Sequence, residues 1–398
     1  MKNLSNYSIK KKKVLFRADL NVPVINGKIT DNSRIVALKN SIQKLIKQQN
    51  KIFILAHYGR PNGKIDKRYS LEFICPILES IFNVKKIHFL KSLDFNSVKH
   101  KISEINFGEI CLIENIRFHP GEEKIDLNFV KDLSKSFDVY VNDAFSASHR
   151  KHASITGFAK YLPAVAGDYL LEEIRNINLF LKNKTKPNFA IIGGSKVSSK
   201  IKLLNNLIEL FTTIAIGGAM ANTFLLSNNH NVGKSIVEED LINEAKKIQL
   251  KAKNYNCKLI LPIDVVCSNS IKDKTSIRYC DIKNIFPNHM ILDIGKKSTK
   301  LITNEILKSK MLLWNGPVGA FEYKPFDQST VEIAVTVKNY ARKLNINTLA
   351  GGGDTISSIK SANAESGFTY ISSAGGAFLE WLEGKESPGV IALNKNNF

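Results

Sequence analysis

The sequence is poor in cysteine and holds only two tryptophans among its 398 residues. The five cysteines are scattered, with no C-x-x-C pair and no short metal-ligand spacing, so we assign them no metal or redox role. No stretch approaches 18 consecutive apolar residues, and no membrane-spanning helix is expected. The first residues are basic but lack the apolar region and cleavage site of a secretion signal. We therefore expect a cytoplasmic location.

Acidic residues are few beside basic ones, and the formal net charge is +21. A charge of this size is compatible with nucleic-acid or membrane binding. The lysines, however, are spread along the whole chain rather than gathered in a tail or on one helix face. We therefore expect no specific nucleic-acid partner and no membrane association.

Arginine is scarce, with nine residues among the 57 basic ones. Five of the nine lie in or beside compact motifs rich in Gly, His and Asn: Arg17, Arg34, Arg60, Arg117 and Arg150. The planar guanidinium binds phosphate and carboxylate through two parallel hydrogen bonds, which lysine cannot do. Ordinary ion pairs remain the alternative for some of them, but the grouping favours an anion site.

Short, almost continuously apolar runs recur along the chain, with amphipathic segments such as 33–48 and 328–344 between them. The first series comprises 13–20, 51–58, 109–116 and 137–145, and the second comprises 189–194, 212–218, 258–266, 289–295, 311–317 and 347–353. Continuous apolar runs are typical of parallel strands covered on both faces. The alternation predicts an α/β fold with two doubly wound, Rossmann-like domains and parallel sheets.

The boundary between these domains is expected within 161–189, where an amphipathic segment leads into the polar connector KNKTKP. We predict an N-terminal domain over 1–168 and a C-terminal domain over 169–377, the latter including a hinge helix. Ligands of open α/β sheets bind beyond the carboxyl ends of the strands. The glycines, arginines and polar motifs of this sequence fall at those ends.

The stretch FAIIGGSKVSSKI (189–201) ends an apolar run in two glycines and then offers Lys196 and Lys200. It lacks the spacing of a Walker A loop. Glycines allow the backbone to approach a ligand, and a following helix would present free N–H groups to a phosphate. We expect both lysines on one face of that helix, with a phosphate chain across them. For this segment alone, a solvated helix face is the alternative.

Three further segments of the second half indicate a nucleotide site. LAGGGDTISSIK (349–360) places Asp354 and Thr355 in the first turn of a helix, where the carboxylate could hold Mg²⁺ that bridges phosphate oxygens. WNGPVGAFE (314–322) closes with Glu322, which could bond a ribose hydroxyl. IGGAMANTF (216–224) supplies a Gly–Gly shelf for a base.

The first half carries RADLNVP (17–23), ITDNSRI (29–35), AHYGRP (56–61), ENIRFHPGEE (114–123) and NDAFSASHRKHAS (142–154). Each ends a predicted strand or follows one. Asp19 and Asn21 can bind hydroxyl groups, and histidine beside arginine is more often a hydrogen-bond donor than a base. The combination predicts a pocket for a small, hydroxylated polyanion.

These motifs together, with GGGDT and LEWLEGKESPGV, resemble the phosphoglycerate kinase family in order and spacing over essentially the whole chain. The resemblance implies reversible phosphoryl transfer from 1,3-bisphosphoglycerate to ADP, giving 3-phosphoglycerate and MgATP, in glycolysis and gluconeogenesis (EC 2.7.2.3). It also implies a monomer with two lobes, a cleft between them, and a C-terminal segment 378–398 that completes the first lobe.

The resemblance further implies a role for individual residues. It places the glycerate ligand on Asp19, Asn21, Arg34, His57, Arg60, Arg117 and Arg150. It places the nucleotide on Lys200, Gly217, Gly218, Asn315, Glu322, Gly352, Gly353, Asp354 and Thr355, with Mg²⁺ at Asp354. The catalytic residues would be Arg34, Lys196, Lys200 and Gly375.

Physical reasoning agrees with this reaction, because the attacking phosphate and the leaving carboxylate are both ionised at neutral pH and need no general base. Catalysis would then consist of positioning the reactants and stabilising charge. Because the donors come from two lobes, the resemblance also implies hinge closure.

The segment SSAGGAFLE (372–380) departs from the family pattern at Ser373, Ala374 and Phe378. We expect a strand end and a helix start here, with negative φ at Ala374. Two rival functions are another acyl-phosphate kinase, acting on acetate or carbamate, and a non-catalytic basic protein that binds RNA or membrane.

Overall fold

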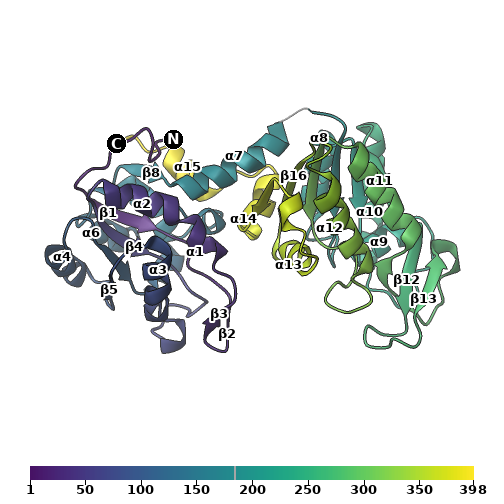
Figure 1. Ribbon diagram of the computed structural model, residues 1–398, viewed down its shortest axis with the longest axis horizontal. Helices are drawn as coiled ribbons and strands as arrows, with labels where there is room; N and C mark the ends of the chain where they lie inside the picture. The colour runs from purple at the N-terminus through teal and green to yellow at the C-terminus, as the bar shows by residue number, and fades with distance from the viewer. Residues whose placement is uncertain (183–184) are drawn as a thin grey trace. The chain divides into compact units, whose positions relative to one another are not determined.

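The computed structural model describes residues 1–182 and 185–398 (Figure 1). It divides into two compact units, which we call unit 1 (Met1–Arg175 with Glu386–Phe398) and unit 2 (Asn176–Lys385). Each unit contains one six-stranded sheet flanked by helices. Within the described ranges, no helix has both the length and the apolar character needed to cross a bilayer.

The sheet of unit 1 is entirely parallel, in the order β5-β6-β4-β1-β7-β8. Its strands are β1 (Lys13–Arg17), β4 (Lys51–Leu55), β5 (Ile87–Leu90), β6 (Ile110–Ile113), β7 (Val139–Asn142) and β8 (Ala164–Ala166). The central strands are buried along almost their whole length, which explains their continuous apolar sequences. The short hairpin β2 (Val24–Ile25) and β3 (Lys28–Ile29) turns at Asn26–Gly27, both with positive φ.

The helices of unit 1 are α1 (Ser33–Ala37), α2 (Lys39–Lys47), α3 (Cys75–Phe82), α4 (Phe95–Glu104), α5 (Gly121–Lys124), α6 (Leu127–Ser134) and α15 (Pro388–Asn394). The helix expected over 33–48 is thus two helices that meet at Leu38. Local sequence sets several helix starts: Asp94 and Asp126 each accept backbone N–H bonds at the beginning of α4 and α6.

The main sheet of unit 2 is also parallel, in the order β11-β10-β9-β15-β16-β17. Its strands are β9 (Asn188–Ile192), β10 (Thr213–Ile216), β11 (Lys258–Ile260), β15 (Met311–Asn315), β16 (Asn347–Gly351) and β17 (Tyr370–Ser372). Counted along the chain this is the 3-2-1-4-5-6 order of the Rossmann fold, and the direction of winding reverses between β9 and β15. The expectation of doubly wound α/β units is confirmed.

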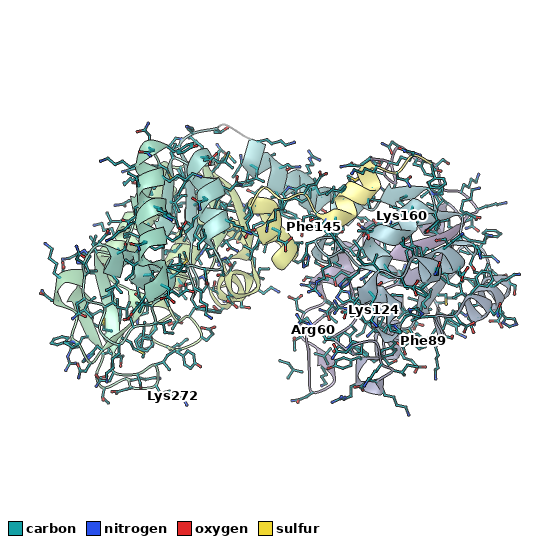
Figure 2. All side chains as sticks on the ribbon, turned by 180° about the vertical axis from the view of Figure 1, so that it is seen from behind. Arg60, Phe89, Lys124, Phe145, Lys160 and Lys272 are labelled. Atoms are coloured by element: carbon teal, nitrogen blue, oxygen red, sulfur yellow. The ribbon has the colours of Figure 1, made fainter. Side chains whose placement is uncertain are left out.

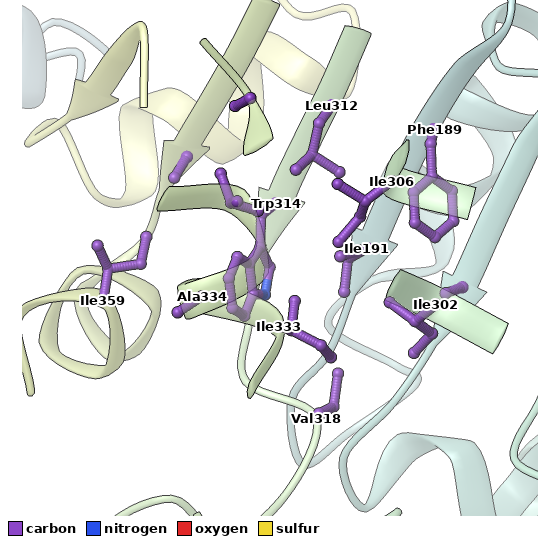
Figure 3. Close-up of a cluster of buried hydrophobic side chains, with 14 of the residues drawn as sticks. Phe189, Ile191, Ile302, Ile306, Leu312, Trp314, Val318, Ile333, Ala334 and Ile359 are labelled. Atoms are coloured by element: carbon purple, nitrogen blue, oxygen red, sulfur yellow. The ribbon is translucent and has the colours of Figure 1, made fainter. Parts of the chain in front are cut away.

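The helices of unit 2 are α8 (Ile201–Leu210), α9 (Met220–Ser227), α10 (Ile242–Asn254), α11 (Lys296–Lys308), α12 (Gln328–Tyr340), α13 (Gly353–Ser361) and α14 (Gly376–Leu382). Beneath α11 and α12, the side chains of β9 and β15 form an apolar cluster around Trp314 (Figure 3). The indole is fully buried, and its N–H donates to the carbonyl of Gly316 at 2.8 Å. The core therefore extends to the loop that leaves β15.

A three-stranded antiparallel sheet, β13-β12-β14, accompanies the main sheet of unit 2. It consists of β12 (Asp264–Ser268), β13 (Arg278–Asp281) and β14 (Met290–Ile294). Two expectations are therefore wrong. The run 258–266 is interrupted at Pro262, which has no N–H for a ladder, and forms β11 and β12. The run 289–295 pairs antiparallel in the small sheet instead of joining the parallel one.

The units differ from the predicted domains at both boundaries. Helix α7 (Asp168–Lys182) begins in unit 1, and the division falls within it, after Arg175. Helix α14 belongs to unit 2, where Asn206 of α8 donates to the Leu382 carbonyl at 2.5 Å. The C-terminal segment of unit 1 therefore begins at Glu386 rather than at Phe378. Residues 183 and 184 of the expected connector lie outside the described residues.

Phe378 is fully buried, and its ring lies against the backbone of Gly351 at the end of β16. A Cβ at Gly351 would lie 2.5 Å from Cε1 of that ring. We expect Gly351→Ala to lower the free energy of unfolding of unit 2 by about 1–3 kcal/mol, the usual effect of overpacking. Both tryptophans of the chain, Trp314 and Trp381, lie in unit 2, so denaturant unfolding followed by tryptophan fluorescence reports on this unit.

Gly353→Ala is the matched control, because a Cβ there meets no atom within 4 Å. Equal unfolding midpoints for the two variants would contradict the packing of Phe378 against Gly351.

Candidate active site

Polar side chains of unit 1 gather where β1 and β7 end. Asp19, 1% exposed, follows β1, and its Oδ2 pairs with Nη1 of Arg34 at 3.1 Å. The Ser146 hydroxyl, beyond β7, donates to the same oxygen, and Oδ1 accepts the Asn21 N–H at 3.1 Å. The Arg34 Nη1 also donates to the Asn21 carbonyl at 2.9 Å. One buried carboxylate thus orients an arginine and the loop that precedes it.

A second set of contacts connects this group with Arg117. Asn21 Oδ1 accepts the N–H of Gly59 at 3.0 Å, and the Gly59 carbonyl accepts from Arg117 Nη1 at 2.6 Å. Gly59 has φ +60° and is overlain by the Tyr69 ring, so no side chain fits there. Burial and the neighbouring cation Arg150 lower the pKa of Arg117 to about 10. The loops after β1, β4 and β6 are thereby joined into one polar surface.

His57 follows β4 and is 7% exposed. Burial, and then the cations Arg17, Arg117 and Arg150, lower the pKa of His57 well below its ordinary value. The imidazole is therefore uncharged at neutral pH and acts as a hydrogen-bonding group in a positive environment.

The two remaining arginines differ in exposure. Arg150 lies close enough to Arg117 and His57 to lower the pKa of both, and its Nε donates to Nε2 of His149 at 3.2 Å. Arg60, labelled in Figure 2, is exposed and makes no hydrogen bond or ion pair with any residue in the described part of the chain. The structure therefore groups six of the seven expected residues by direct contact or electrostatic interaction, and Arg60 adjoins them through Gly59.

Arg17 does not fit the expectation of an arginine that faces a ligand. It is 1% exposed and donates to Ser154, to backbone carbonyls and to His57. The sequence contained a signal for this difference, because Arg17 is the last residue of an apolar strand whereas the other four lie in loops or at helix starts. Sequence reasoning also missed Ser146, Ser154 and Glu122, whose contacts appear only after folding.

In unit 2 the backbone closes tightly at the point where the winding of the sheet reverses. A Cβ on Gly193 or on Gly316 would overlap the backbone of the other loop, and one on Gly218 would lie 2.6 Å from the Gly194 carbonyl. Gly194, Gly218 and Gly316 have φ of +134°, +67° and +100°. The loops after β9, β10 and β15 are therefore in contact, backbone to backbone, as a glycine-lined cradle for a ligand requires.

Lys200 lies beside this cradle, and its Nζ donates to Oδ1 of Asn315. Asn315, 2% exposed, donates in turn to the Gly351 carbonyl at 2.6 Å. Burial lowers the pKa of Lys200 to about 8, although the acidic groups Glu383 and Asp354 oppose that shift. Asn315 thus holds the ammonium group of Lys200 toward the end of β15.

The expectation of two lysines on one helix face is wrong. Helix α8 begins only at Ile201, so Lys196 and Lys200 lie in the turn before it. Glu238 holds this turn by accepting the backbone N–H of Ser198 at 3.0 Å and its hydroxyl at 2.6 Å. Lys196 is exposed, and its ammonium group makes no hydrogen bond or ion pair with the residues described.

Helix α13 starts directly beyond β16 and presents the glycine-rich N-terminus that the sequence predicted. Gly352 has φ +101°, and a Cβ on it would lie 2.8 Å from Nδ2 of Asn315. The Thr355 hydroxyl is buried and accepts the Gly316 N–H at 2.7 Å, so it braces the loop after β15. Gly353 and Asp354 are exposed at the first turn, where N–H groups and the helix dipole favour an anion.

A cavity of about 300 Å³ opens beside this helix. Its lining combines glycine backbone, apolar side chains and three acidic residues, and includes Gly194, Gly218, Val318, Asp293, Glu322 and Asp354. Gly217 lies behind the lining, against Val318. A cavity of this size, lined by glycine, apolar and acidic residues, suits a nucleoside, with Glu322 available to a ribose hydroxyl.

The loop after β17 agrees with expectation, since a strand ends at Ser372 and α14 begins at Gly376. Ala374 is not among the residues with positive φ, whereas Gly375 has φ +56° and no atom within 4 Å of its Cβ position. Gly375 therefore leaves its backbone open to a ligand, and the negative φ expected at Ala374 is confirmed.

Asp354 is also a suitable Mg²⁺ ligand. No cluster of three metal-binding side chains exists within residues 1–182 and 185–398. Mg²⁺ that arrives with a nucleotide needs only one or two carboxylates, because phosphates and water complete its octahedron. An exposed carboxylate at the rim of a nucleoside-sized cavity fits this arrangement.

A cluster of cationic and polar residues on one doubly wound unit and a glycine-lined cavity beside helix α13 on the other are typical of an α/β kinase. The sequence matches the family Phosphoglycerate kinase over residues 4–385. The phosphoglycerate kinase of Chelativorans sp. (strain BNC1) is 44% identical over 384 residues, 96% of each chain, and that of Brucella abortus is 42% identical over 394 residues, 99% of each.

Comparison with solved structures indicates the same family. The structure of phosphoglycerate kinase from Coxiella burnetii has a TM-score of 0.89 at 35% identity, covering 99% of this chain and 98% of that one. The enzyme from Pyrococcus horikoshii OT3 has a TM-score of 0.84 at 27% identity with the same coverage. This chain belongs to the phosphoglycerate kinase family, so it is a kinase of glycolysis.

The lowered pKa of Lys200 leads to a measurable proton uptake. At pH near 8 about half of the Lys200 side chains are uncharged in the free protein. A bound nucleotide phosphate favours the ammonium form, so ADP binding should make Lys200 take up protons near pH 8, and Lys200 should contribute little uptake near pH 6, where it is already charged. Affinity should decline as the pH rises above 8.

Calorimetric titration in buffers of different ionisation enthalpy measures this uptake. Lys200→Met should abolish it, whereas Lys196→Met, which removes an exposed ammonium four residues earlier, should leave it intact. Undiminished uptake in Lys200→Met would assign the proton to another group.

Proposed function

We propose that the protein catalyses reversible phosphoryl transfer between 1,3-bisphosphoglycerate and ADP, giving 3-phosphoglycerate and ATP. The observation that carries this proposal is a site rich in cations but without a general base. His57 lies among arginines, and its pKa is lowered so far that it is an uncharged donor. A transfer between a carboxylate and a phosphate oxygen needs no proton abstraction, so such a site suits it.

The acceptor would bind to unit 1. Arg60, Arg117 and Arg150 are suited to its phosphate, because guanidinium groups match phosphate oxygens. Asp19 and Asn21 offer oxygen and amide groups to the hydroxyl. A glycerate with two anionic ends uses all of these, whereas acetate or carbamate leaves most of them unpaired. The arginine content of unit 1 therefore favours 3-phosphoglycerate over those acceptors.

The nucleotide would bind to unit 2, with its base on the shelf of Gly217 and Gly218 and its ribose at Glu322. Its phosphates would then meet the start of α13, where Gly352, Gly353 and Asp354 lie, and the ammonium of Lys200. Thr355 and Asn315 contribute by holding the loop and Lys200 in place. Mg²⁺ bound at Asp354 would neutralise phosphate charge.

In the transition state the transferring group is close to metaphosphate, and its charge lies on three equatorial oxygens. Arg34, Lys196, Lys200 and the backbone N–H groups at Gly375 are the donors that we assign to those oxygens. Arg34 is already oriented by Asp19, and Lys200 by Asn315. Donors that are fixed before the ligand arrives stabilise the developing charge without reorganisation. We further propose that the protein is a cytoplasmic monomer.

Arg34→Ala and Lys200→Ala should each lower kcat by about 100-fold or more, since each removes a cation from the transferring group. The assay is MgATP-dependent phosphorylation of 3-phosphoglycerate, with acetate and carbamate as alternative acceptors. Lys246→Ala, an exposed lysine of α10, and Arg342→Ala, an exposed arginine after α12, are the controls for lost charge. Tryptophan fluorescence and circular dichroism verify that the variants fold.

Turnover with acetate or carbamate but none with 3-phosphoglycerate would refute the acceptor assignment. Unchanged kcat in both variants would refute the roles given to Arg34 and Lys200.

A further inference from the structure

Arg17 donates hydrogen bonds to three separate parts of unit 1. Its Nε donates to the Ser154 hydroxyl at 2.9 Å, and its Nη1 donates to the carbonyls of Ala18 and Leu55. Its Nη2 lies 3.0 Å from Nδ1 of His57. The guanidinium is 1% exposed, so these contacts hold it in a single orientation.

Glu122 anchors the far end of this chain of contacts. It is fully buried, and its two oxygens accept the Ser154 hydroxyl at 2.7 Å and the Ser154 backbone N–H at 2.8 Å. Since a hydroxyl has one proton, Ser154 gives it to Glu122 and must accept from Arg17. The direction of every bond from Glu122 to Arg17 is thereby set.

The last bond of the chain determines the tautomer of His57. A guanidinium has only donors, so Nδ1 of His57 must accept from Arg17. Around the ring lie Arg17, Arg117, Arg150 and His152, which together with burial disfavour the imidazolium form. A neutral imidazole has one proton, and with Nδ1 accepting, that proton is on Nε2.

We propose that Arg17 is a positioning residue for acceptor binding, which fixes His57 as the Nε2–H tautomer and so makes it a hydrogen-bond donor to an oxyanion of the acceptor. Nε2 has no hydrogen-bond partner among the residues that the structure describes. The opposite tautomer would turn a lone pair toward the anion and repel it. The identity of the oxyanion rests on the proposed function, but the tautomer does not.

The first test measures the tautomer directly, without activity. In protein labelled with ¹⁵N-histidine, long-range ¹H–¹⁵N correlation distinguishes protonated from unprotonated ring nitrogens, and the His57→Gln variant assigns the signals. We expect a protonated Nε2 and an unprotonated Nδ1 at neutral pH. A proton on Nδ1 at neutral pH would overturn the proposal.

The second test compares two amides at position 57. The side-chain nitrogen of glutamine can occupy the place of Nε2, whereas that of asparagine reaches only the place of Nδ1. His57→Gln should therefore keep the KM for 3-phosphoglycerate within a few-fold of the wild-type value. His57→Asn should raise it by about tenfold or more, the effect of losing a hydrogen bond to a charged group, with a smaller change in kcat. Equal KM values would overturn the donor role.

The third test separates positioning from a purely structural role of Arg17. Arg17→Gln removes the guanidinium donor at Nδ1 and the largest of the charges that lower the pKa of His57, so that pKa should rise, although burial, Arg117 and Arg150 still lower it. The KM for 3-phosphoglycerate should then depend on pH differently in the variant, with a larger fall on acidification than in the wild type. Parallel pH profiles would count against the proposal.

If Arg17→Gln does not fold, the tautomer measurement and the two variants at position 57 still test the proposal. A wild-type protein without turnover would refute the proposed function, and the tautomer experiment would remain valid.

Discussion

The proposed nucleotide site depends on how closely the loops after β9, β10 and β15 approach one another. These loops meet at the reversal of winding in the unit 2 sheet, and Gly193, Gly218 and Gly316 leave no room for a Cβ at the contacts. That approach brings Asn315 within reach of Lys200 and the Gly316 N–H within reach of Thr355. Replacement of any of these glycines would separate the loops, and the cavity and the buried lysine would lose their geometry together.

Both units hold cations at their proposed ligand sites, but they stabilise these cations in different ways. A site for polyanions must hold cations close together in the absence of ligand. Unit 1 pairs Arg34 with the buried Asp19 and ties Arg117 to a backbone carbonyl. Unit 2 buries one lysine and bonds it to the neutral Asn315, so desolvation lowers its pKa to about 8. Unit 1 therefore keeps its cations charged near neutral pH, whereas the charge on Lys200 is easily lost above pH 8.

Much of this molecule could be predicted because its strands are buried on both faces and its glycines stand at strand ends. The errors have specific causes. Pro262 interrupts an apolar run that the sequence suggests is one strand. The segment before α8, which the sequence suggests is the start of a helix, is a turn, because Ser198 bonds to Glu238 some 40 residues further along the chain. Arg17 reads as a ligand-binding arginine, yet its donors are taken by Ser154 and His57. The first error is local, since proline has no N–H, whereas the other two involve partners that are distant in the sequence.

The sequence alone determined the α/β class, the two sheets, the glycines and arginines at the strand ends, and the family. These features are local, since apolar periodicity and motif spacing are read along the chain. Only the tertiary structure decided which arginine is buried among protein donors and acceptors, that the unit boundary falls within α7 and that α14 belongs to unit 2, and which ring nitrogen of His57 accepts a bond. Those outcomes depend on hydrogen-bond direction and desolvation, which exist only once Glu122, Ser154, Arg17 and His57 are brought together by folding.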